Sequence, residues 1–75
     1  MSPEQVVANL FGHGVGEISD ATSQETLTEW DSLGHVTLVI ELESRYGVSF
    51  SPEEAIAMTN VGAIKHTLRE HGATW

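Results

Sequence analysis

The sequence predicts an all-α domain with three main helices, one short helix and a long first loop. Two stretches, Ser2-Pro3-Glu4-Gln5 and Ser51-Pro52-Glu53-Glu54, carry the same helix-start pattern. In this pattern a serine caps the helix, proline fills its first position and Gln or Glu completes a capping box. Apolar residues elsewhere recur three or four positions apart, as they do on the buried side of a helix. Strand-like character is limited to residues 48–50, so helices are favoured throughout.

The first helix is predicted over about residues 3–11. Ser2 is its cap, and Gly12 is its stop because glycine readily adopts the left-handed conformation that ends a helix. Its apolar face consists of Val6, Val7, Leu10 and Phe11. Residues 13–30 then form a long connection with weak periodicity, in which Ile18 and Leu27 are isolated apolar positions. Long connections in small domains are often functional, and this one lets the helices it joins lie in an unusual relation.

The second helix is predicted to begin at Asp31 or Ser32 and to end at Tyr46. Asp31 is a good N-cap, and Gly47 is a good residue to follow the last turn. At about 100° per residue, the apolar positions of this helix form two stripes on roughly opposite sides. The first stripe is Leu38, Val39, Leu42 and Tyr46, and the second is Leu33, Val36 and Ile40. One stripe should face the core; the other is either exposed for docking or covered by loop residues, and spacing alone does not decide.

The short third helix is expected to be capped by Ser51, with an apolar side made of Ala55, Ile56 and Met58. Thr59 or Asn60 caps the last helix, and Gly72 ends it. Its core-facing residues are Val61, Ile64 and Leu68. Lys65 and Arg69 lie towards its C-terminal end, where cations complement the helix dipole.

The chain carries eleven acidic residues and three basic ones, so its formal net charge is -8. Nucleic acids and anionic membranes are poor partners for such a surface, because they require clustered Lys or Arg. A partner with a basic patch would be attracted instead. The charge also confers solubility, and composition does not separate these two roles.

The absence of cysteine excludes disulfides and thiolate metal sites, and the four histidines are too scattered for a zinc spacing. We therefore expect no metal site. No apolar run is long enough to cross a bilayer, and the N-terminus lacks the regions of a signal peptide. These features predict a cytoplasmic protein. Its length predicts one domain over residues 1–75, and a monomer is the default expectation.

The candidate functional residue is Ser32, which lies at the start of the second helix directly after the long loop. A phosphate ester at this position would face unpaired backbone N–H groups and the positive end of the helix dipole. Gly34 keeps the neighbouring surface free of side chains. The alternative for an isolated Asp-Ser-Leu tripeptide is ordinary N-capping.

A longer pattern surrounds this serine: Trp30-Asp31-Ser32-Leu33-Gly34-His35-Val36, then Leu38, Ile40 and Glu41-Leu42-Glu43, then Tyr46-Gly47-Val48 and Phe50. The pattern resembles the acyl carrier protein family, in which D-S-L opens the second helix and its serine carries 4′-phosphopantetheine through a phosphodiester. Residues 51–54 and 59–62 resemble the family's short third helix and the start of its fourth. The resemblance covers about residues 27–70 well and the first helix loosely.

The resemblance implies an acyl-carrier-type four-helix bundle and a non-catalytic carrier. Such a carrier tethers acyl intermediates as thioesters for enzymes of fatty-acid, polyketide or related specialised biosynthesis. Ser32 matches the modified serine, and Asp31 matches the acidic residue that the modifying enzyme recognises. The other implied recognition residues are Leu33, Val36, Ile40, Glu41 and Glu43. The implied partners are a phosphopantetheinyl transferase that uses coenzyme A, and acyl-loading and acyl-processing enzymes such as an acyltransferase, a ketosynthase or a ligase.

One departure from the family pattern lies just before the serine. Many fatty-acid carriers have small residues there, whereas this chain has Glu29 and Trp30. Trp30 either staples the loop onto the helix or shapes a specialised docking surface. The departure argues against an ordinary fatty acyl chain as cargo.

Three other functions fit parts of the sequence. Asp31, Ser32 and His35 suggest a catalytic triad, but a triad needs an oriented base and an oxyanion hole in a sheltered site, so catalysis is rejected. We expect His35 to point towards the core. An aminoacyl or peptidyl carrier shares the fold and the arm but delivers other cargo. An unmodified helical adaptor would use the same apolar stripe for docking without any arm.

Overall fold

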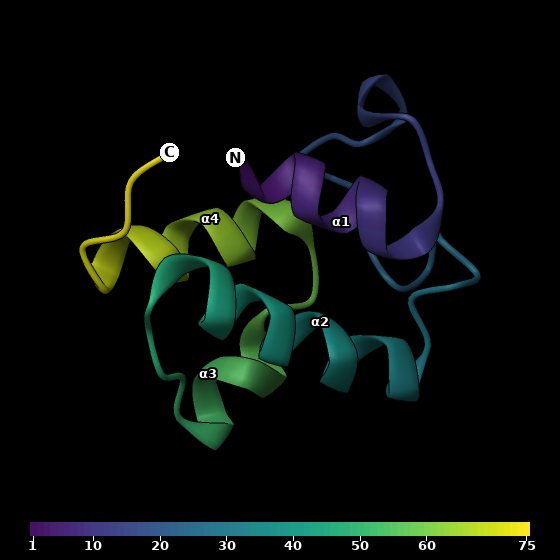
Figure 1. The fold of residues 1–75 in the computed structure, drawn as a ribbon. Helices are drawn as coiled ribbons and strands as arrows, with labels where there is room; N and C mark the ends of the chain where they lie inside the picture. Colours follow the sequence, from purple (N-terminus) through teal and green to yellow (C-terminus); the bar gives the residue numbers. More distant parts are fainter.

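Four α-helices and one short 3₁₀ helix make up the regular structure of the protein, and there is no β-strand (Figure 1). The computed structural model describes all residues from 1 to 75. In chain order the elements are α1 (Pro3–Phe11), η1 (Val15–Glu17), α2 (Ser32–Tyr46), α3 (Pro52–Ala57) and α4 (Val61–Glu70). The all-α fold and the positions of its four helices are therefore confirmed. None of the helices is long and apolar enough to cross a membrane.

Local capping explains why the helices begin where they do. The Ser2 hydroxyl accepts from the backbone N–H of Gln5 at 3.2 Å, and the Gln5 side chain accepts from the backbone of Ser2 at 2.8 Å. Ser51 and Glu54 form the same reciprocal pair at the start of α3, at 3.1 and 2.9 Å. Of the two caps proposed for α4, Asn60 is the one used: its amide oxygen accepts from the Ala63 N–H at 2.7 Å. These contacts satisfy backbone donors that the first turn of a helix leaves unpaired.

Glycine ends the first two helices. Gly12 and Gly47 have φ angles of 76° and 63°, in the left-handed region that favours glycine. Their backbone N–H groups donate to the carbonyl oxygens of Ala8 and Glu43, respectively, and so satisfy acceptors of the last helical turn.

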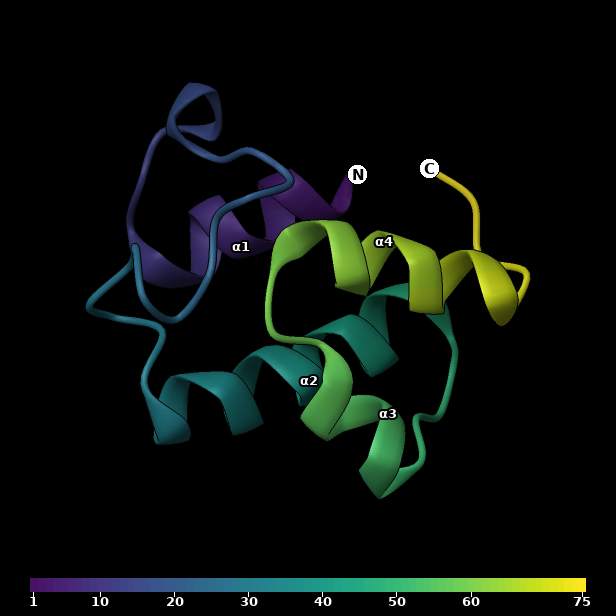
Figure 2. The same ribbon diagram turned by 180° about the vertical axis from the view of Figure 1, so that it is seen from behind.

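The long first connection is fixed to the bundle at several points. Ile18 and Leu27, its two isolated apolar residues, are both buried. The backbone N–H groups of Val61 and Gly62, at the start of α4, donate to carbonyl oxygens of the connection. The chain passes from the end of α1 to the start of α4 and then back to the start of α2 (Figure 2). The connection is therefore a packed part of the fold, and it positions the start of α2.

The core lies between α1, α2 and α4, and residues from the connection close it. Its largest fully buried side chains are Trp30, Leu38, Leu42, Met58, Ile64 and Leu68. All three predicted core residues of α4 are fully buried, as are Val6 and Val7 of α1. In α2, the first stripe faces this core, with Val39 and Tyr46 partly buried at its edges.

The prediction for α3 was wrong in one respect. Ile56 was assigned to the apolar side of this helix, but its side chain is 75% exposed. The helix has only six residues, and it is anchored instead by Met58, which lies just past its end and is fully buried. A helix this short buries one narrow edge, and Ile56 lies about 100° around the axis from its partly buried neighbour Ala55.

Candidate functional site

Ser32 is the first residue of α2, and it is exposed. The capping of this helix falls to its neighbour: one carboxylate oxygen of Asp31 accepts from the Gly34 N–H at 2.8 Å. The Asp31 carbonyl also accepts from the His35 N–H at 2.8 Å. Because Asp31 performs the capping, the alternative in which Ser32 serves only as an N-cap does not apply. The serine hydroxyl therefore lies at the helix start without a capping role.

Trp30 holds the segment before Ser32 in place. Its side chain is fully buried, and its indole Nε1–H donates to Nδ1 of His35 at 2.9 Å. On the other side of the imidazole ring, His35 Nε2 lies 2.7 Å from the Ala55 carbonyl oxygen. Since Nδ1 accepts, Nε2 must be the protonated nitrogen that donates to Ala55. The connection, α2 and α3 are thus linked through one neutral imidazole, and Trp30 acts as a staple and not as part of a docking surface.

His35 is the part-buried structural histidine that the sequence predicted. Both of its ring nitrogens are occupied by the contacts to Trp30 and Ala55. The ring also stacks on the Trp30 indole, with ring centres 6.1 Å apart, and Phe11 stacks on that indole at 6.0 Å. A ring held in this way has no free nitrogen with which to accept a proton from Ser32.

Gly34 is required by the close approach of the backbone, a reason that differs from the expected one. A Cβ atom at this position would lie 2.5 Å from the carbonyl oxygen of Glu29 and 3.0 Å from a ring carbon of Phe11. The first contact is with backbone, so a larger residue would push the segment before Ser32 away from α2. Glycine therefore allows the stapled segment to pass directly over the first turn of the helix.

A second, exposed contact holds the segment before Ser32 in place. His13 Nε2 lies 3.1 Å from a carboxylate oxygen of Glu29, and His13 Nδ1 lies 3.8 Å from Glu17. The hydrogen bond to Glu29 is the main reason that the pKa of His13 is raised, and it likewise lowers the pKa of Glu29. This ion pair closes the connection on itself next to the buried Trp30.

The second apolar stripe of α2 is exposed. Leu33, Val36 and Ile40 expose 76%, 56% and 60% of their surface, and they begin at the residue after Ser32. The question that helical spacing left open is thus decided in favour of exposure. Large apolar side chains gathered on one helix face are typical of surfaces that bind other proteins.

The acidic residues assigned to partner recognition have different surroundings. Asp31 is exposed beside Ser32, although one of its oxygens caps the helix. Glu41 accepts from the guanidinium of Arg45 at 2.9 Å, on the flank of α2 that faces α1. Glu43 accepts from the backbone N–H of Phe50 at 2.9 Å, on the flank towards α3. Glu41 and Glu43 therefore border the exposed stripe from opposite sides, and each has an internal partner.

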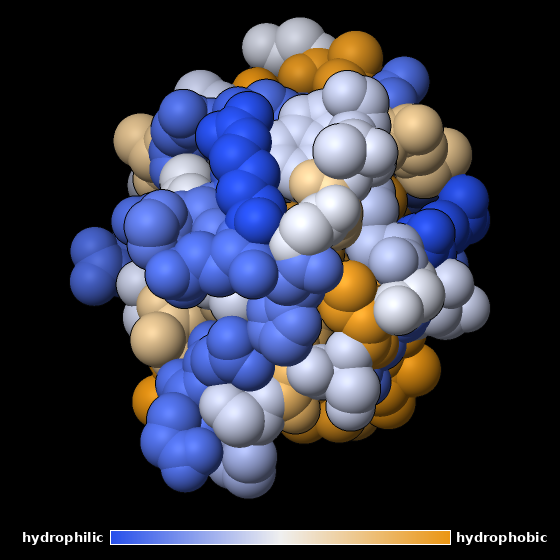
Figure 3. Space-filling model, turned by 90° about the vertical axis from the view of Figure 1, so that its left-hand side faces the viewer, coloured by the Kyte–Doolittle hydropathy of each residue, from blue (hydrophilic) through white to orange (hydrophobic).

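The end of the bundle farthest from Ser32 differs from the stripe. There, on the left of Figure 1, the surface is mainly hydrophilic, and apolar atoms appear only in separate areas (Figure 3). No group of three or more His, Asp or Glu side chains is arranged to hold a metal ion. The candidate site is thus Ser32 with the exposed stripe beside it.

No family model matches the chain, and no curated protein is significantly similar to it. The function is therefore inferred from the residues and their geometry.

The sequence did not predict the side-chain contacts that hold the start of α2 in position. The bonds of His35 to Trp30 and Ala55 join residues five and twenty positions apart. Neither spacing is a recognised motif. A tryptophan directly before a helix cap was the one available signal, and it did not reveal its partner.

Proposed function

We propose that this protein is an acyl carrier protein and that Ser32 carries a 4′-phosphopantetheine arm. The observation that supports it best is an exposed serine at the first position of α2 whose capping role is taken by Asp31. The serine hydroxyl is thus free to be the acceptor in a transfer of phosphopantetheine from coenzyme A. The D-S-L pattern at the start of the second helix is an independent reason for the proposal.

The start of α2 is chemically suited to a phosphodiester. The backbone N–H groups of Ser32 and Leu33 have no acceptor within the helix, and they point towards its N-terminal end. An anion at such a position is stabilised by about 0.3–1 kcal/mol. Gly34 adds no side chain that would shield the serine from a modifying enzyme. When attached, the arm supplies the thiol that this cysteine-free chain lacks, and that thiol holds acyl groups as thioesters.

The exposed stripe is proposed as the docking surface for partner enzymes. Leu33, Val36 and Ile40 would enter an apolar groove on the partner, while Asp31 and the chain's net charge of -8 attract basic residues around it. The first such partner is the phosphopantetheinyl transferase. Later partners are enzymes that load or process the acyl group, such as an acyltransferase, a ketosynthase or a ligase. The protein itself performs no chemistry.

The test is the intact mass of the protein before and after incubation with coenzyme A and a promiscuous phosphopantetheinyl transferase. The proposal expects the gain of one phosphopantetheine, mapped to Ser32. Ser32→Ala should abolish the gain with its helix content unchanged. Ser44→Ala, at an exposed serine on the same helix, is the matched control and should be modified fully. A folded protein that gains no mass would instead be an unmodified adaptor.

A further inference from the structure

The imidazole of His35 contacts both the segment before Ser32 and α3. Its Nδ1 accepts from the Trp30 indole N–H at 2.9 Å, and its Nε2 lies 2.7 Å from the Ala55 carbonyl oxygen. A carbonyl oxygen can only accept, so the contact with Ala55 places the ring proton on Nε2. The other ring nitrogen is then left with the lone pair that the indole N–H needs. The bond to α3 thus fixes the tautomer that binds Trp30.

The Trp30 indole depends on this one acceptor. Its side chain is fully buried, and the bond to His35 is the only hydrogen bond that its N–H makes. Phe11 stacks on the indole with ring centres 6.0 Å apart, but this contact gives the N–H no acceptor. A buried donor without an acceptor costs free energy, so loss of the bond would favour movement of the indole towards solvent. The position of Trp30 is therefore set by His35.

The backbone carries the position of Trp30 to Ser32. Only Asp31 lies between these two residues. The Asp31 carboxylate accepts from the Gly34 N–H at 2.8 Å and so caps α2. Just before Trp30, the chain passes so close to the helix that a Cβ atom on Gly34 would lie 2.5 Å from the carbonyl oxygen of Glu29. A displaced indole would therefore disturb the cap, and the Ser32 hydroxyl would move with it.

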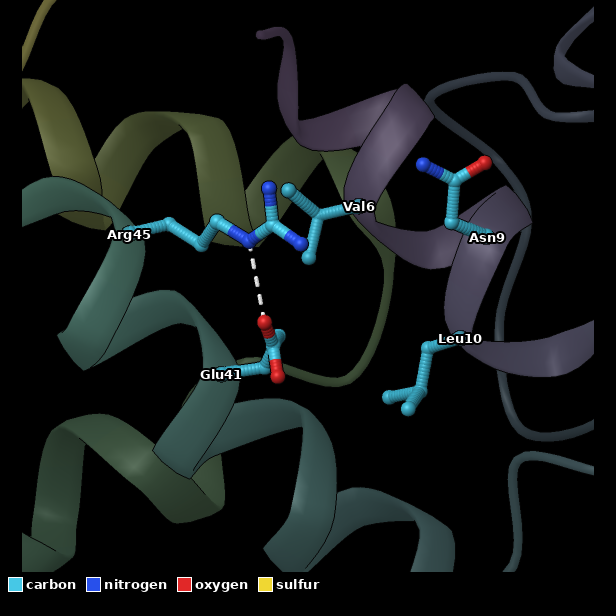
Figure 4. A pocket seen from close by; sticks show the side chains of 5 residues that line it. All are labelled: Val6, Asn9, Leu10, Glu41 and Arg45. Carbon is cyan, nitrogen blue, oxygen red and sulfur yellow. Dashed lines mark hydrogen bonds and ion pairs between the residues drawn. The ribbon is translucent and has the colours of Figure 1, made fainter.

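The opposite flank of α2 has no comparable link to the start of the helix. An open hollow of about 210 Å³ lies there, and its walls include Val6 and Leu10 of α1 and Glu41 and Arg45 of α2 (Figure 4). The hydrogen bond in that view joins Glu41 to Arg45, two residues of the same helix that lie far beyond Ser32 in the chain. The contacts on the α3 flank are therefore the ones that hold the start of α2.

We propose that His35 is a positioning residue for the modification of Ser32. This inference rests on the proposed function, since it requires an arm to be transferred to that serine. His35 acts through Trp30, and both of its ring nitrogens are occupied, so it takes no part in moving a proton. Its effect is to keep the Ser32 oxygen in one place. Transfer rates fall steeply when a reacting atom is displaced by about 1 Å.

Two conservative variants divide the contacts of His35 between them. In His35→Asn the amide oxygen lies about where Nδ1 does, so the indole keeps its acceptor and the bond to Ala55 is lost. In His35→Gln the amide lies about where Nε2 does, so the bond to Ala55 is kept and the indole N–H loses its partner. Circular dichroism should show the helix content of the parent protein in both variants, since each loses only one side-chain hydrogen bond.

The test is the steady-state rate at which a promiscuous phosphopantetheinyl transferase modifies each folded protein. His35→Gln should lower kcat about tenfold, as expected for the loss of about one hydrogen bond in positioning. The KM for the carrier should stay near that of the parent, because the exposed stripe is intact. His35→Asn should restore most of the lost kcat. His66→Gln, at an exposed histidine on α4, is the matched control and should change neither constant.

Trp30→Phe tests the same contact from its other side, because it keeps a buried ring and removes the indole donor. It should lower kcat as His35→Gln does. The protein with both changes should be no slower than either single variant, since the two changes remove one shared contact. In an NMR spectrum, the Trp30 indole resonance should move in His35→Gln and keep its position in His35→Asn.

Intact mass separates this inference from the proposed function. A parent protein that gains no arm at Ser32 contradicts the proposed function. A parent that is modified, with equal kcat in the Asn and Gln variants, overturns the positioning role alone. A rise in KM with kcat unchanged would also overturn it, because His35 would then act on docking. Additive losses in the protein with both changes would show that His35 does not act through Trp30.

Discussion

The two apolar stripes of α2 are alike in composition and opposite in burial. Leu38 and Leu42 are fully buried, whereas Leu33 and Ile40, on the other side of the same helix, are mostly exposed. The difference comes from the rest of the fold: α1, α4 and the stapled connection cover one stripe, and no segment of the chain covers the other. Apolar residues on a helix therefore do not by themselves indicate burial, and the neighbouring elements decide whether an apolar stripe is covered.

The sharpest test of this comparison is a matched pair of truncations on α2. Leu42→Ala removes fully buried methyl groups from the core and should lower the free energy of unfolding by about 2–5 kcal/mol. Ile40→Ala, on the exposed stripe, should change it by no more than about 0.5 kcal/mol. Urea unfolding followed by circular dichroism measures both. Similar losses in the two variants would mean that the second stripe is also internal.

A second prediction concerns the segment that closes the buried stripe. Gly34→Ala places a Cβ atom 2.5 Å from the Glu29 carbonyl, so the backbone near Trp30 must move. The strain should lower the free energy of unfolding by about 1–3 kcal/mol, outweighing a gain of up to about 1 kcal/mol from alanine's helix propensity.

The position of the Trp30 indole resonance in an NMR spectrum reports the same displacement, because its N–H donates to His35. Ser44→Ala, at an exposed position of α2 without such a neighbour, is the control and should be unperturbed. A Gly34→Ala protein as stable as the parent, with an unmoved indole resonance, would show that the close approach is not needed.

The third prediction addresses the exposed stripe as a docking surface. Ile40→Glu should leave the unfolding transition nearly unchanged, because the side chain is exposed. It should lower kcat/KM of the phosphopantetheinyl transferase about tenfold, which corresponds to the loss of one moderate interface contact. Gln24→Glu, with the same added charge at an exposed position of the connection, controls for electrostatics. If Ile40→Glu unfolds the domain, or if the two variants are modified equally fast, the docking assignment is wrong.

Much of the fold could be predicted because its determinants are local in sequence. Ser2 and Gly12 predicted the two ends of α1, and Asp31 and Gly47 those of α2, within one or two residues. The burial of each stripe could not be predicted in the same way, since it depends on segments far along the chain. The error at Ile56 has this origin too: helical spacing assigned it to a face, but a six-residue helix had no second element to cover that face.

The candidate site was predictable only as far as its sequence motif extends. Ser32 and the exposed stripe follow from a contiguous pattern, so their positions were available from the sequence. The contact between Trp30 and His35 could not be predicted, because nothing in their spacing distinguishes a buried indole from an exposed one. Tertiary packing decides which of these side chains is buried.

The prediction with the smallest expected effect concerns the ion pair of His13 and Glu29, which helps to hold the connection over the buried stripe. The pKa of His13 is raised by its hydrogen bond to Glu29, so the contribution of this pair is present at low pH and is lost as pH rises through the raised value. The pKa of Glu29 is lowered by the same bond, so its contribution is lost as pH falls through the lowered value. Since the ordinary pKa values are about 4.3 for Glu and 6.5 for His, the ion pair should contribute most to stability between about pH 5 and 6.5.

Amide hydrogen exchange in residues 13–30, corrected for the intrinsic rate, should therefore show more frequent opening at pH 8 than at pH 5.5. The effect should be small because both side chains are partly exposed and the pair is screened by solvent. His13→Gln should remove the pH dependence, whereas His66→Gln, at an exposed histidine on α4, should preserve it. If opening is the same at both pH values in the parent protein, the ion pair does not help to hold the connection, and its buried side chains and backbone hydrogen bonds suffice.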